Sequence, residues 1–297
     1  MRRNSGLSEH VEVQMGNYWL LLVIIASLSH AFWNIMLKQS EDKTIFLWSL
    51  RVWSVILFLP VSIVLWPKDE HITSEWVLMG LGSIVLHSFY ALILSKAYEK
   101  NDFTLTYPIA RGLGPLIVVA VGVTLLKEPF TWMSIVGSVL IFTGIFVLYT
   151  GLGRGGQSIR SMFTSPYPLL VGLSIAGYTL FDKLAVSFIH PVSLNVIENM
   201  GQVLLLGSLQ VRGWERVRTH WKKYWGSMAI AGGLAGLSYV LVLIVLTEIP
   251  VSYVAPVRET SIVIGSFLGI YFLKERFQSQ KIWGAVLIFA GVVCIVM

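Results

Sequence analysis

Apolar residues come in ten runs separated by short polar stretches, and this alternation is the dominant pattern of the chain. The runs lie near residues 18–37, 44–66, 75–97, 104–126, 131–150, 166–187, 191–211, 225–247, 252–273 and 280–297. A helix of about 20 apolar residues spans the ~30 Å hydrocarbon core of a bilayer, and each run has about that length. The pattern therefore predicts an all-α integral membrane protein with ten transmembrane helices.

The second half of the chain repeats the first. Glycines, an arginine and an apolar run match without a gap under a shift of 147 residues: Arg111 with Arg258, Gly122 with Gly269, Gly137 with Gly284, and 139–144 with 286–291. Each copy holds five apolar runs, an odd number, so the second copy enters the membrane in the opposite direction. We expect two inverted five-helix repeats, 18–150 and 166–297, with a polar segment at 1–17 and a linker at 151–165.

Composition excludes a soluble globular protein. Apolar residues make up 55% of the chain and charged residues 13%, whereas soluble domains carry roughly 25% charged residues. The single cysteine, Cys294, excludes an internal disulfide. The isoelectric point of about 9.4 reflects lysines and arginines in loops, which is typical of contact with lipid headgroups rather than with nucleic acid. Most of these cations follow the odd-numbered helices, so the charge pattern places both termini outside the cell.

Arg111 and Arg258 are the first candidates for a substrate site. Each lies about seven residues inside its apolar run, and an arginine at membrane depth costs at least ~2.5 kcal/mol. Pro108 and Pro256 precede them, and proline removes a backbone hydrogen bond, so we expect helix breaks that expose carbonyls to a cavity. The alternative is structural: each arginine reaches the nearer interface or pairs with a carboxylate such as Glu259.

Other polar residues follow helical faces within the apolar runs. His30, Trp33 and Asn34 share a face of the first helix, and His87 shares one with Tyr90, whose copy in the second repeat is Tyr239.

Asn199 and Glu198 interrupt the seventh run. We predict substrate contacts from these histidines, aromatic residues and Asn199. The carboxylates Glu198 and Glu259 are the candidates for coupling transport to protons, because a carboxylate buried at that depth is protonated or paired. For Asn199 the alternative is a purely structural hydrogen bond between helices.

No arrangement of residues typical of an enzyme occurs. The sequence holds no H-E-x-x-H, no G-x-S-x-G, no Walker loop and no cysteine–histidine metal spacing, so we expect no catalysis, no cofactor and no metal. Three alternatives to anion transport stay open. Glu198 with Trp33 and Tyr90 could serve the export of amino acids or of cationic and aromatic drugs. The arginines could hold the headgroup phosphate of a lipid carrier that is flipped across the bilayer, and an intramembrane enzyme comes last.

A family resemblance rests on residues from both halves: Trp33 with Lys38, the turns 127–130 (Lys-Glu-Pro-Phe) and 274–277 (Lys-Glu-Arg-Phe), and Gly137 with Gly284. In these features the chain resembles the EamA-type carriers of the drug/metabolite transporter superfamily. Two shorter motifs, 30–34 with Lys38 and 107–112, resemble the subgroup associated with phosphonate utilisation. The resemblance implies alternating-access transport of a small organic metabolite, without ATP hydrolysis and without bound metal, and it places both termini inside the cell.

Taken together, the residues and the resemblance predict a secondary carrier in a bacterial inner membrane. Its expected cargo is a small anionic or zwitterionic metabolite that bears a phosphonate, phosphate or carboxylate group. We expect it to be proton-coupled or an exchanger, and to act as a monomer or homodimer with the lipid bilayer and the substrate as its partners. Nucleic acid is not an expected partner.

Overall fold

The computed structural model describes residues 18–68, 71–100, 103–150, 166–210, 213–273 and 279–297. Within these ranges the chain is helical and holds no strand. The helices are α2 (Tyr18–Gln39), α3 (Lys43–Val64), α4 (Ser74–Lys100), α5 (Phe103–Thr124), α6 (Trp132–Thr150), α7 (Tyr167–Ala185), α8 (Pro191–Gln210), α9 (Trp214–Glu248), α10 (Val251–Arg258), α11 (Thr260–Leu273) and α12 (Ser279–Val296). All ten predicted runs are helical, and the ninth is divided into α10 and α11. The segments 1–17 and 151–165 lie outside the described residues.

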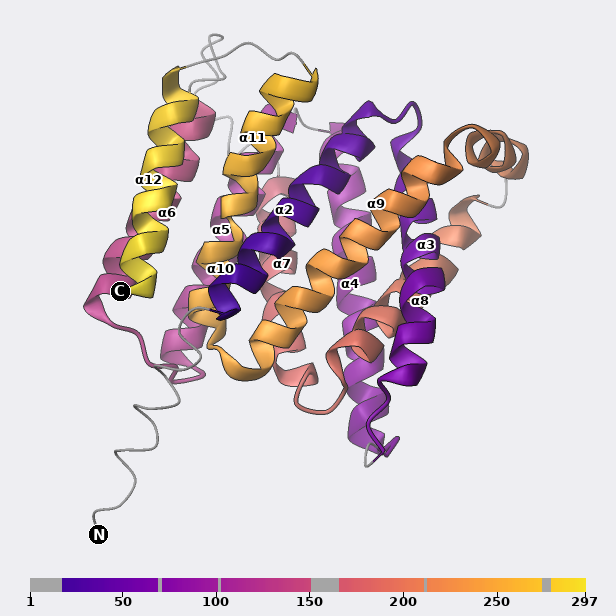
Figure 1. Cartoon of the computed structure of the whole chain (residues 1–297), viewed down its shortest axis with the longest axis horizontal. Coiled ribbons are helices and arrows are strands. Elements are labelled where there is room, and N and C mark those ends of the chain that lie inside the picture. The colour runs from indigo at the N-terminus through magenta and orange to yellow at the C-terminus, as the bar shows by residue number, and fades with distance from the viewer. Residues whose placement is uncertain (1–17, 69–70, 101–102, 151–165, 211–212, 274–278) are drawn as a thin grey trace.

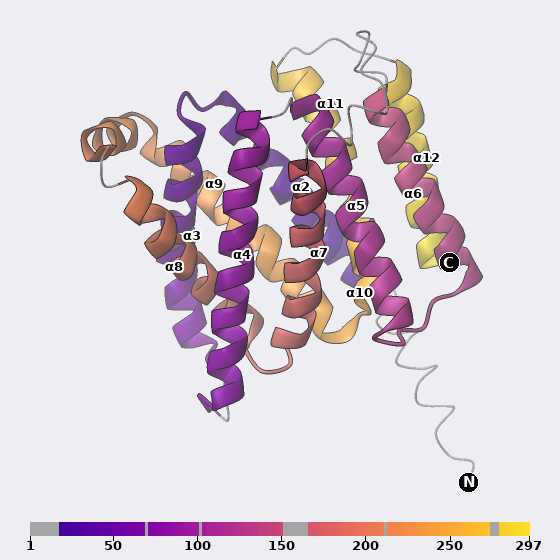
Figure 2. The same ribbon diagram turned by 180° about the vertical axis from the view of Figure 1, so that it is seen from behind.

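The two repeats are inverted with respect to each other. In Figure 1, α2 rises through the bundle, whereas its counterpart α7 descends, and the later helices of each repeat keep this opposition (Figures 1 and 2). The packing obeys the same pseudo-two-fold relation. The first helix of each repeat packs on the third and fourth helices of the other: α2 on α9 and α11, and α7 on α4 and α5. The centre of the bundle is therefore built from both copies.

The glycines that mark the repeat lie in the contact between α6 and α12. A methyl group added at Gly137 would lie 2.5 Å from the carbonyl oxygen of Gly291, and one added at Gly144 would lie 2.8 Å from that of Gly284. These distances leave no room for a side chain, so the two backbones touch. Small residues permit this close approach between helices in a membrane. The repeated glycines are thus explained by packing.

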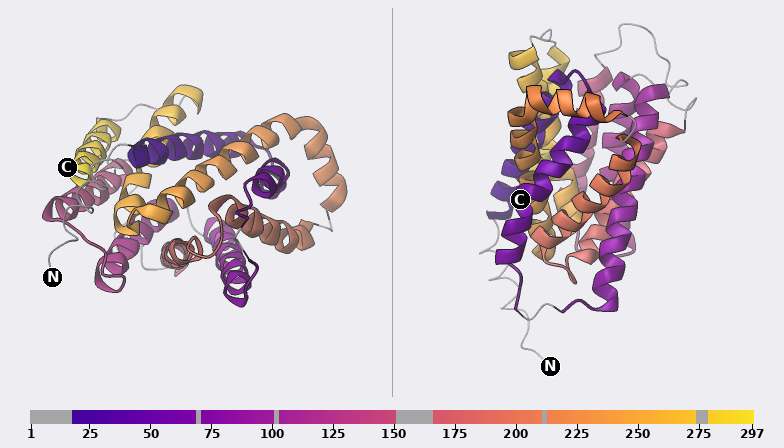
Figure 3. Two further views of the ribbon diagram at one scale, coloured as in Figure 1. Left: turned by 60° about the horizontal axis from the view of Figure 1, so that its bottom comes forward. Right: turned by 90° about the vertical axis from the view of Figure 1, so that its right-hand side faces the viewer.

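One helix departs from its predicted length. α9 begins at Trp214, whereas the apolar run begins near residue 225. Its first turns alternate exposed Arg216 and Arg218 with buried Val217, so they form a helix with a charged outer face that a hydropathy pattern does not detect. Figure 3 shows this part of α9 bent away from the axis of the longer, apolar part.

The outer surface of the bundle is apolar. Among the described residues, four helical segments are long and apolar enough to cross a membrane: Tyr18–Gln39, Lys43–Val64, Ser74–Leu94 and Trp214–Glu248. Shorter apolar segments occur at Arg111–Thr124, Trp132–Val147 and Lys281–Val296. Large side chains such as Ile63, Trp283 and Phe289 are exposed on these helices. An apolar exterior around buried polar residues is the arrangement of a protein surrounded by lipid.

Candidate functional site

Both repeat arginines line one pocket near the centre of the bundle. Its lining comes from α5, α7, α9, α10 and the start of the break after α10: Arg111, Pro115, Val118, Ile175, Tyr178, Thr179, Val242, Leu246, Val251, Val254, Ala255, Arg258 and Glu259. Two guanidinium groups and one carboxylate therefore face a space whose other walls are mostly apolar.

The fourth helix of the second repeat is interrupted at this pocket. α10 ends at Arg258, Glu259 forms a turn, and α11 begins at Thr260. Pro256 has no N–H group, so the carbonyl four residues before it loses its helical hydrogen bond. At the end of α10 the Glu259 N–H donates a hydrogen bond to the Pro256 carbonyl at 3.0 Å. The hydroxyl of Ser27 on α2 donates to the Arg258 carbonyl at 3.2 Å. The break thus has partners for its backbone groups, and it presents Arg258 and Glu259 to the pocket.

The first repeat does not share this interruption. α5 continues as one helix from Phe103 to Thr124 through Pro108, whose side chain lies outside the described residues. The helix break expected at Pro108 is therefore a wrong prediction. One proline removes a single bond from the helical ladder, and a true break needs further partners for the freed groups. In the second repeat Ser27 is such a partner.

The short helix α10 is held at its first turn by a residue of the other repeat. The carboxylate of Glu128 accepts hydrogen bonds from the backbone N–H groups of Val251 at 2.8 Å and Ser252 at 2.9 Å. These N–H groups have no partner inside the helix, and a carboxylate also favours the positive end of the helix dipole. Lys127, just before it, has a φ of 57°, which turns the chain so that Glu128 reaches α10. Glu128 thereby fixes the helix that carries Arg258.

Arg111 takes part in a polar network across the interface of the repeats. Its guanidinium lies 3.4 Å from Glu259 Oε1 and donates to the Nε2 atom of His30 on α2 at 2.8 Å. A third contact joins it to the hydroxyl of Ser261 at 3.4 Å. Its side chain is 12% exposed and that of Glu259 is 3% exposed. Pairing with Glu259, the structural alternative for this arginine, is therefore present, and it occurs inside the pocket.

Arg258 and Glu259, which both line the pocket, each keep unused bonding capacity. Within the described part of the chain, Arg258 forms no ion pair with a carboxylate, and its guanidinium lies 5.6 Å from the centroid of the Tyr239 ring. Glu259 uses Oε1 for Arg111, while its buried Oε2 atom has no hydrogen-bond partner in the structure. An unpaired guanidinium beside a half-satisfied carboxylate is costly unless a ligand completes both.

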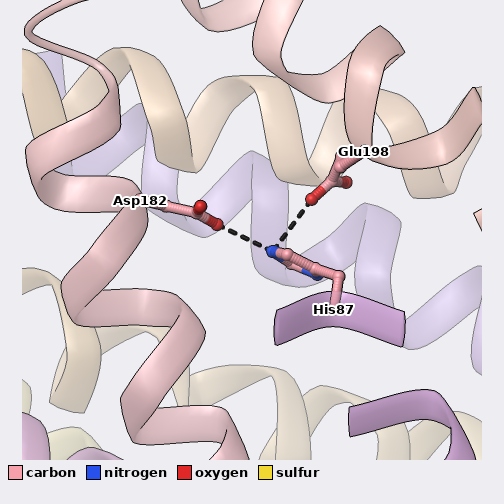
Figure 4. Close-up of side chains that lie close together, drawn as sticks. All are labelled: His87, Asp182 and Glu198. Atoms are coloured by element: carbon pink, nitrogen blue, oxygen red, sulfur yellow. Dashed lines mark hydrogen bonds and ion pairs between the residues drawn. The ribbon is translucent and has the colours of Figure 1, made fainter. Parts of the chain in front are cut away.

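A second polar cluster lies deeper among α4, α7 and α8. The Nε2 atom of His87 is 2.7 Å from Asp182 Oδ2 and 2.9 Å from Glu198 Oε2, and Figure 4 shows its ring pointing between the two carboxylates. The exposed fractions of the three side chains are 6%, 0% and 1%. Their nearest donor atoms lie within 4.8 Å of one another, which would suit a small cation or a shared proton.

Neighbouring residues hold both carboxylates in place. The hydroxyl of Ser83 donates to Asp182 Oδ1 at 2.8 Å, and that of Tyr239 donates to Asp182 Oδ2. The amide of Asn199 lies 3.4 Å from Glu198 Oε1, and its own oxygen accepts from Arg51 at 3.2 Å. Asp182 therefore has a neutral donor on each oxygen, whereas Glu198 has one on Oε1 only, and its buried Oε2 atom lies near His87 without a hydrogen-bond partner. Tyr239 also lies beneath Arg258, so it touches both polar clusters.

The structure distributes the predicted site residues over three places. Arg111, Arg258 and Glu259 line the pocket, and His30 and Trp33 lie behind Arg111, with their rings 5.1 Å apart. His87, Glu198 and Tyr239 form the deeper cluster. Three predicted residues do not line the pocket. Asn34 donates to the His30 carbonyl, and Asn199 accepts a hydrogen bond from Arg51. The ring of Tyr90 contacts that of Tyr178.

Sequence reasoning missed Asp182 and Tyr178. Asp182 is an acidic residue in an apolar helix directly before Lys183, and it follows Tyr178 by one helical turn, so a carboxylate at membrane depth was a signal available in the sequence. Lys183 obscures it by suggesting a helix end. In the structure Lys183 turns to the end of α9 and donates to the carbonyls of Leu246 and Ile249 at 2.7 and 3.1 Å. Asp182 stays in the interior of the bundle, where it contacts His87, Ser83 and Tyr239.

Comparisons with known proteins agree with this architecture. The model of the EamA-like transporter family matches the chain twice, at residues 17–150 and 164–297. An uncharacterized protein of Methanocaldococcus jannaschii is 33% identical over 109 residues, which cover 36% of this chain and 78% of that protein. A crystal structure of a protein at 13% identity superimposes with a TM-score of 0.65 over 95% of this chain and 96% of its own, which shows the fold alone.

The two family matches cover both repeats and nearly all of the chain. Together with the apolar helices they identify an integral, multi-pass membrane protein of the drug/metabolite transporter superfamily, and a transporter rather than an enzyme. The chain belongs to the EamA-like transporter family.

Proposed function

We propose that this transporter carries a small zwitterionic metabolite with an oxyanion at one end and an amine at the other. The oxyanion is a phosphonate, phosphate or carboxylate group. Transport proceeds by alternating access across a bacterial inner membrane, driven by protons or by exchange for a second metabolite. Glu198 and Glu259 are the predicted carboxylates through which a proton could be coupled.

The observation that carries this proposal is the charge pattern of the pocket. Two guanidinium groups against one carboxylate leave a net positive charge, which attracts an oxyanion. Arg258, which has no carboxylate partner among the described residues, offers a planar fork of donors to two oxyanion oxygens. The free Oε2 atom of Glu259 offers an acceptor to an ammonium group. A zwitterion matches both, whereas a purely cationic drug is repelled by both arginines.

The test is uptake into proteoliposomes with four matched probes: aminomethylphosphonate, methylphosphonate, methylamine and glycine. We expect uptake of the two zwitterions, weaker uptake of methylphosphonate and none of methylamine. Arg258→Lys keeps the charge but loses the bidentate geometry. Hydrogen bonds to charged groups contribute about 1.5–3 kcal/mol, so we expect its uptake rate to fall roughly ten- to hundredfold.

Arg216→Lys is the matched control, because Arg216 is exposed on α9 and pairs with Asp42 at 2.8 Å, away from the pocket. This variant should transport normally. Normal transport by Arg258→Lys would show that this arginine is structural. Uptake of methylamine in preference to the zwitterions would show that the cargo is cationic.

A further inference from the structure

His87, Asp182 and Glu198 of the deeper cluster do not line the pocket. Its three groups come from helices of both repeats, α4 from the first and α7 and α8 from the second, and all are buried. The Nε2 atom of an imidazole holds one hydrogen at most. Two carboxylate oxygens at 2.7 and 2.9 Å therefore compete for a single hydrogen. Asp182 Oδ2 also receives the hydrogen of the Tyr239 hydroxyl, whereas the buried Oε2 atom of Glu198 has no hydrogen-bond partner, so the arrangement is complete only when another proton is present.

The charges around the cluster do not supply the missing compensation. Facing it are Ser83 from α4, Tyr178 from α7, Asn199 from α8 and Tyr239 from α9, all of them neutral. The nearest cations stand one residue further away: Arg51 on α3 contacts Asn199, and Arg258 contacts the Tyr239 ring. Two buried carboxylates against one imidazole are costly in a low dielectric unless bound protons reduce their charge. The cluster is thus built to hold an exchangeable proton.

The short distances favour a proton over a metal ion. Ligand atoms on one tetrahedral zinc ion, each 2.0–2.1 Å from the metal, lie about 3.3 Å from one another. Here the nitrogen lies 2.7 and 2.9 Å from the two oxygens, and these are hydrogen-bond lengths. The oxygens that face away, Asp182 Oδ1 and Glu198 Oε1, have donors of their own. Glu259 is less suited to carry the proton, because its Oε1 atom is held by Arg111.

Tyr239 connects the cluster to the pocket. Its hydroxyl donates to Asp182 Oδ2 and lies 3.2 Å from His87 Nε2, while its ring lies against the guanidinium of Arg258. When the cluster loses its proton, it becomes more negative by one charge and attracts Arg258 toward the Tyr239 side. When the proton binds, that attraction weakens and Arg258 is available to an oxyanion in the pocket. Proton and oxyanion therefore favour each other's binding, and such coupling is reciprocal.

We propose that His87, Asp182 and Glu198 form the binding site of the coupling proton, and that Tyr239 transmits its occupancy to Arg258, so that proton and oxyanion are carried in the same direction. This proposal rests on the proposed function, and it adds the co-transported ion and the residues that bind it. In each cycle one proton enters the cluster from the side where the substrate binds, and it leaves to water on the other side when the substrate is released.

The first experiment measures two kinds of transport of labelled aminomethylphosphonate in proteoliposomes with the membrane voltage clamped. One is accumulation driven by a gradient of one pH unit, acid on the side of the substrate. The other is exchange of labelled for unlabelled substrate at equal pH. One proton per cycle supports about tenfold accumulation, since one pH unit corresponds to ~1.36 kcal/mol. In Asp182→Asn and Glu198→Gln we expect accumulation to disappear, while exchange stays within about twofold of the unmodified protein.

Tyr239→Phe removes the connecting hydroxyl and keeps the ring, so the cluster still binds its proton but the response of accumulation to pH is reduced. Glu41→Gln is the matched control, because Glu41 lies exposed on the loop between α2 and α3, where it pairs with Lys223. It should retain both accumulation and exchange. Full accumulation in Asp182→Asn and Glu198→Gln would overturn the proposal.

A second measurement does not depend on the cargo and covers variants that fail to transport. Infrared difference spectra of the purified protein between acid and alkaline pH report a buried carboxyl group that gains a proton. We expect such a band in the unmodified protein and its loss in Asp182→Asn or Glu198→Gln. A band without uptake of any probe would leave the proton site standing and refute the proposed cargo. A band that is unchanged in Asp182→Asn and Glu198→Gln would refute the proton site. So would stabilisation of the unmodified protein by zinc alone, if Asp182→Asn loses that stabilisation.

Discussion

Replacement of Glu128 by alanine tests how the site is held in place. The change removes the acceptor of two backbone N–H groups at the start of α10, which lie 2.8 and 2.9 Å from its oxygens. Hydrogen bonds to charged groups contribute about 1.5–3 kcal/mol each, and water or a frayed turn replaces part of that for a partly buried group. Losses at helix N-caps are about 0.5–2 kcal/mol, so for two bonds we expect a loss of ~2–3 kcal/mol.

The assay is thermal unfolding of the protein in detergent, followed by tryptophan fluorescence. A loss of 1 kcal/mol shifts the midpoint by about 2–4 °C in chains of 150–250 residues, so we expect a decrease of roughly 4–12 °C. Gly122→Ala reaches the same contact from the other side, because its methyl group would lie 2.7 Å from Glu128 Oε2. It should also lower the midpoint. Glu41→Ala, on an exposed loop, is the control and should change little.

An unchanged midpoint in both Glu128→Ala and Gly122→Ala would refute the reasoning. It would mean that the first turn of α10 is held by its packing alone, since Val251 and Val254 are buried there. A decrease in Gly122→Ala without one in Glu128→Ala would point to the contact of Gly122 with Ser252, where the added methyl group would lie 3.3 Å from the Cβ atom.

Two further changes test the packing and the turn. Gly137→Ala places a methyl group 2.5 Å from the Gly291 carbonyl oxygen and should destabilise the protein by several kcal/mol, whereas Gly226→Ala, which meets nothing within 4 Å, should leave the thermal midpoint unchanged or raise it. Equal midpoints for the two variants would contradict the contact between α6 and α12. Lys127→Gly should stabilise the protein by up to about 1 kcal/mol in denaturant unfolding, because glycine adopts a φ of 57° without strain; a loss of stability would show that the lysine side chain has a compensating contact.

The helices and their inverted arrangement were predictable because a bilayer demands long apolar helices, and a duplicated odd number of them must invert. The repeated glycines were visible in the sequence for a physical reason, since α6 and α12 have no room for a side chain at Gly137 or Gly291. The start of α9 was not predictable from hydropathy. Its first turns carry charged residues outside the apolar part and are still helical.

The sequence predicted the charged residues of the candidate site, but it predicted only some of the contacts between them. Arg111, Arg258 and Glu259 stand out because charge is rare in apolar helices. Their convergence in one pocket depends on how α5 packs against α10, which a single sequence does not contain. The cluster around Asp182 illustrates the same limit. Asp182 lies 95 residues after His87 along the chain, and Glu198 lies 111 residues after it. Only the packing of α4, α7 and α8 brings the three residues together.

The most direct measurement is calorimetric binding of aminomethylphosphonate and methylphosphonate to the purified protein and to Glu259→Gln. Both probes carry the oxyanion, and only the first carries an amine to pair with the Glu259 carboxylate. In the unmodified protein we predict tighter binding of aminomethylphosphonate, by roughly tenfold or more, from a hydrogen bond to a charged group worth about 1.5–3 kcal/mol. In Glu259→Gln that preference should vanish while methylphosphonate still binds. Equal affinity for both probes in the unmodified protein, or an undiminished preference in Glu259→Gln, would contradict a pocket built for a zwitterion.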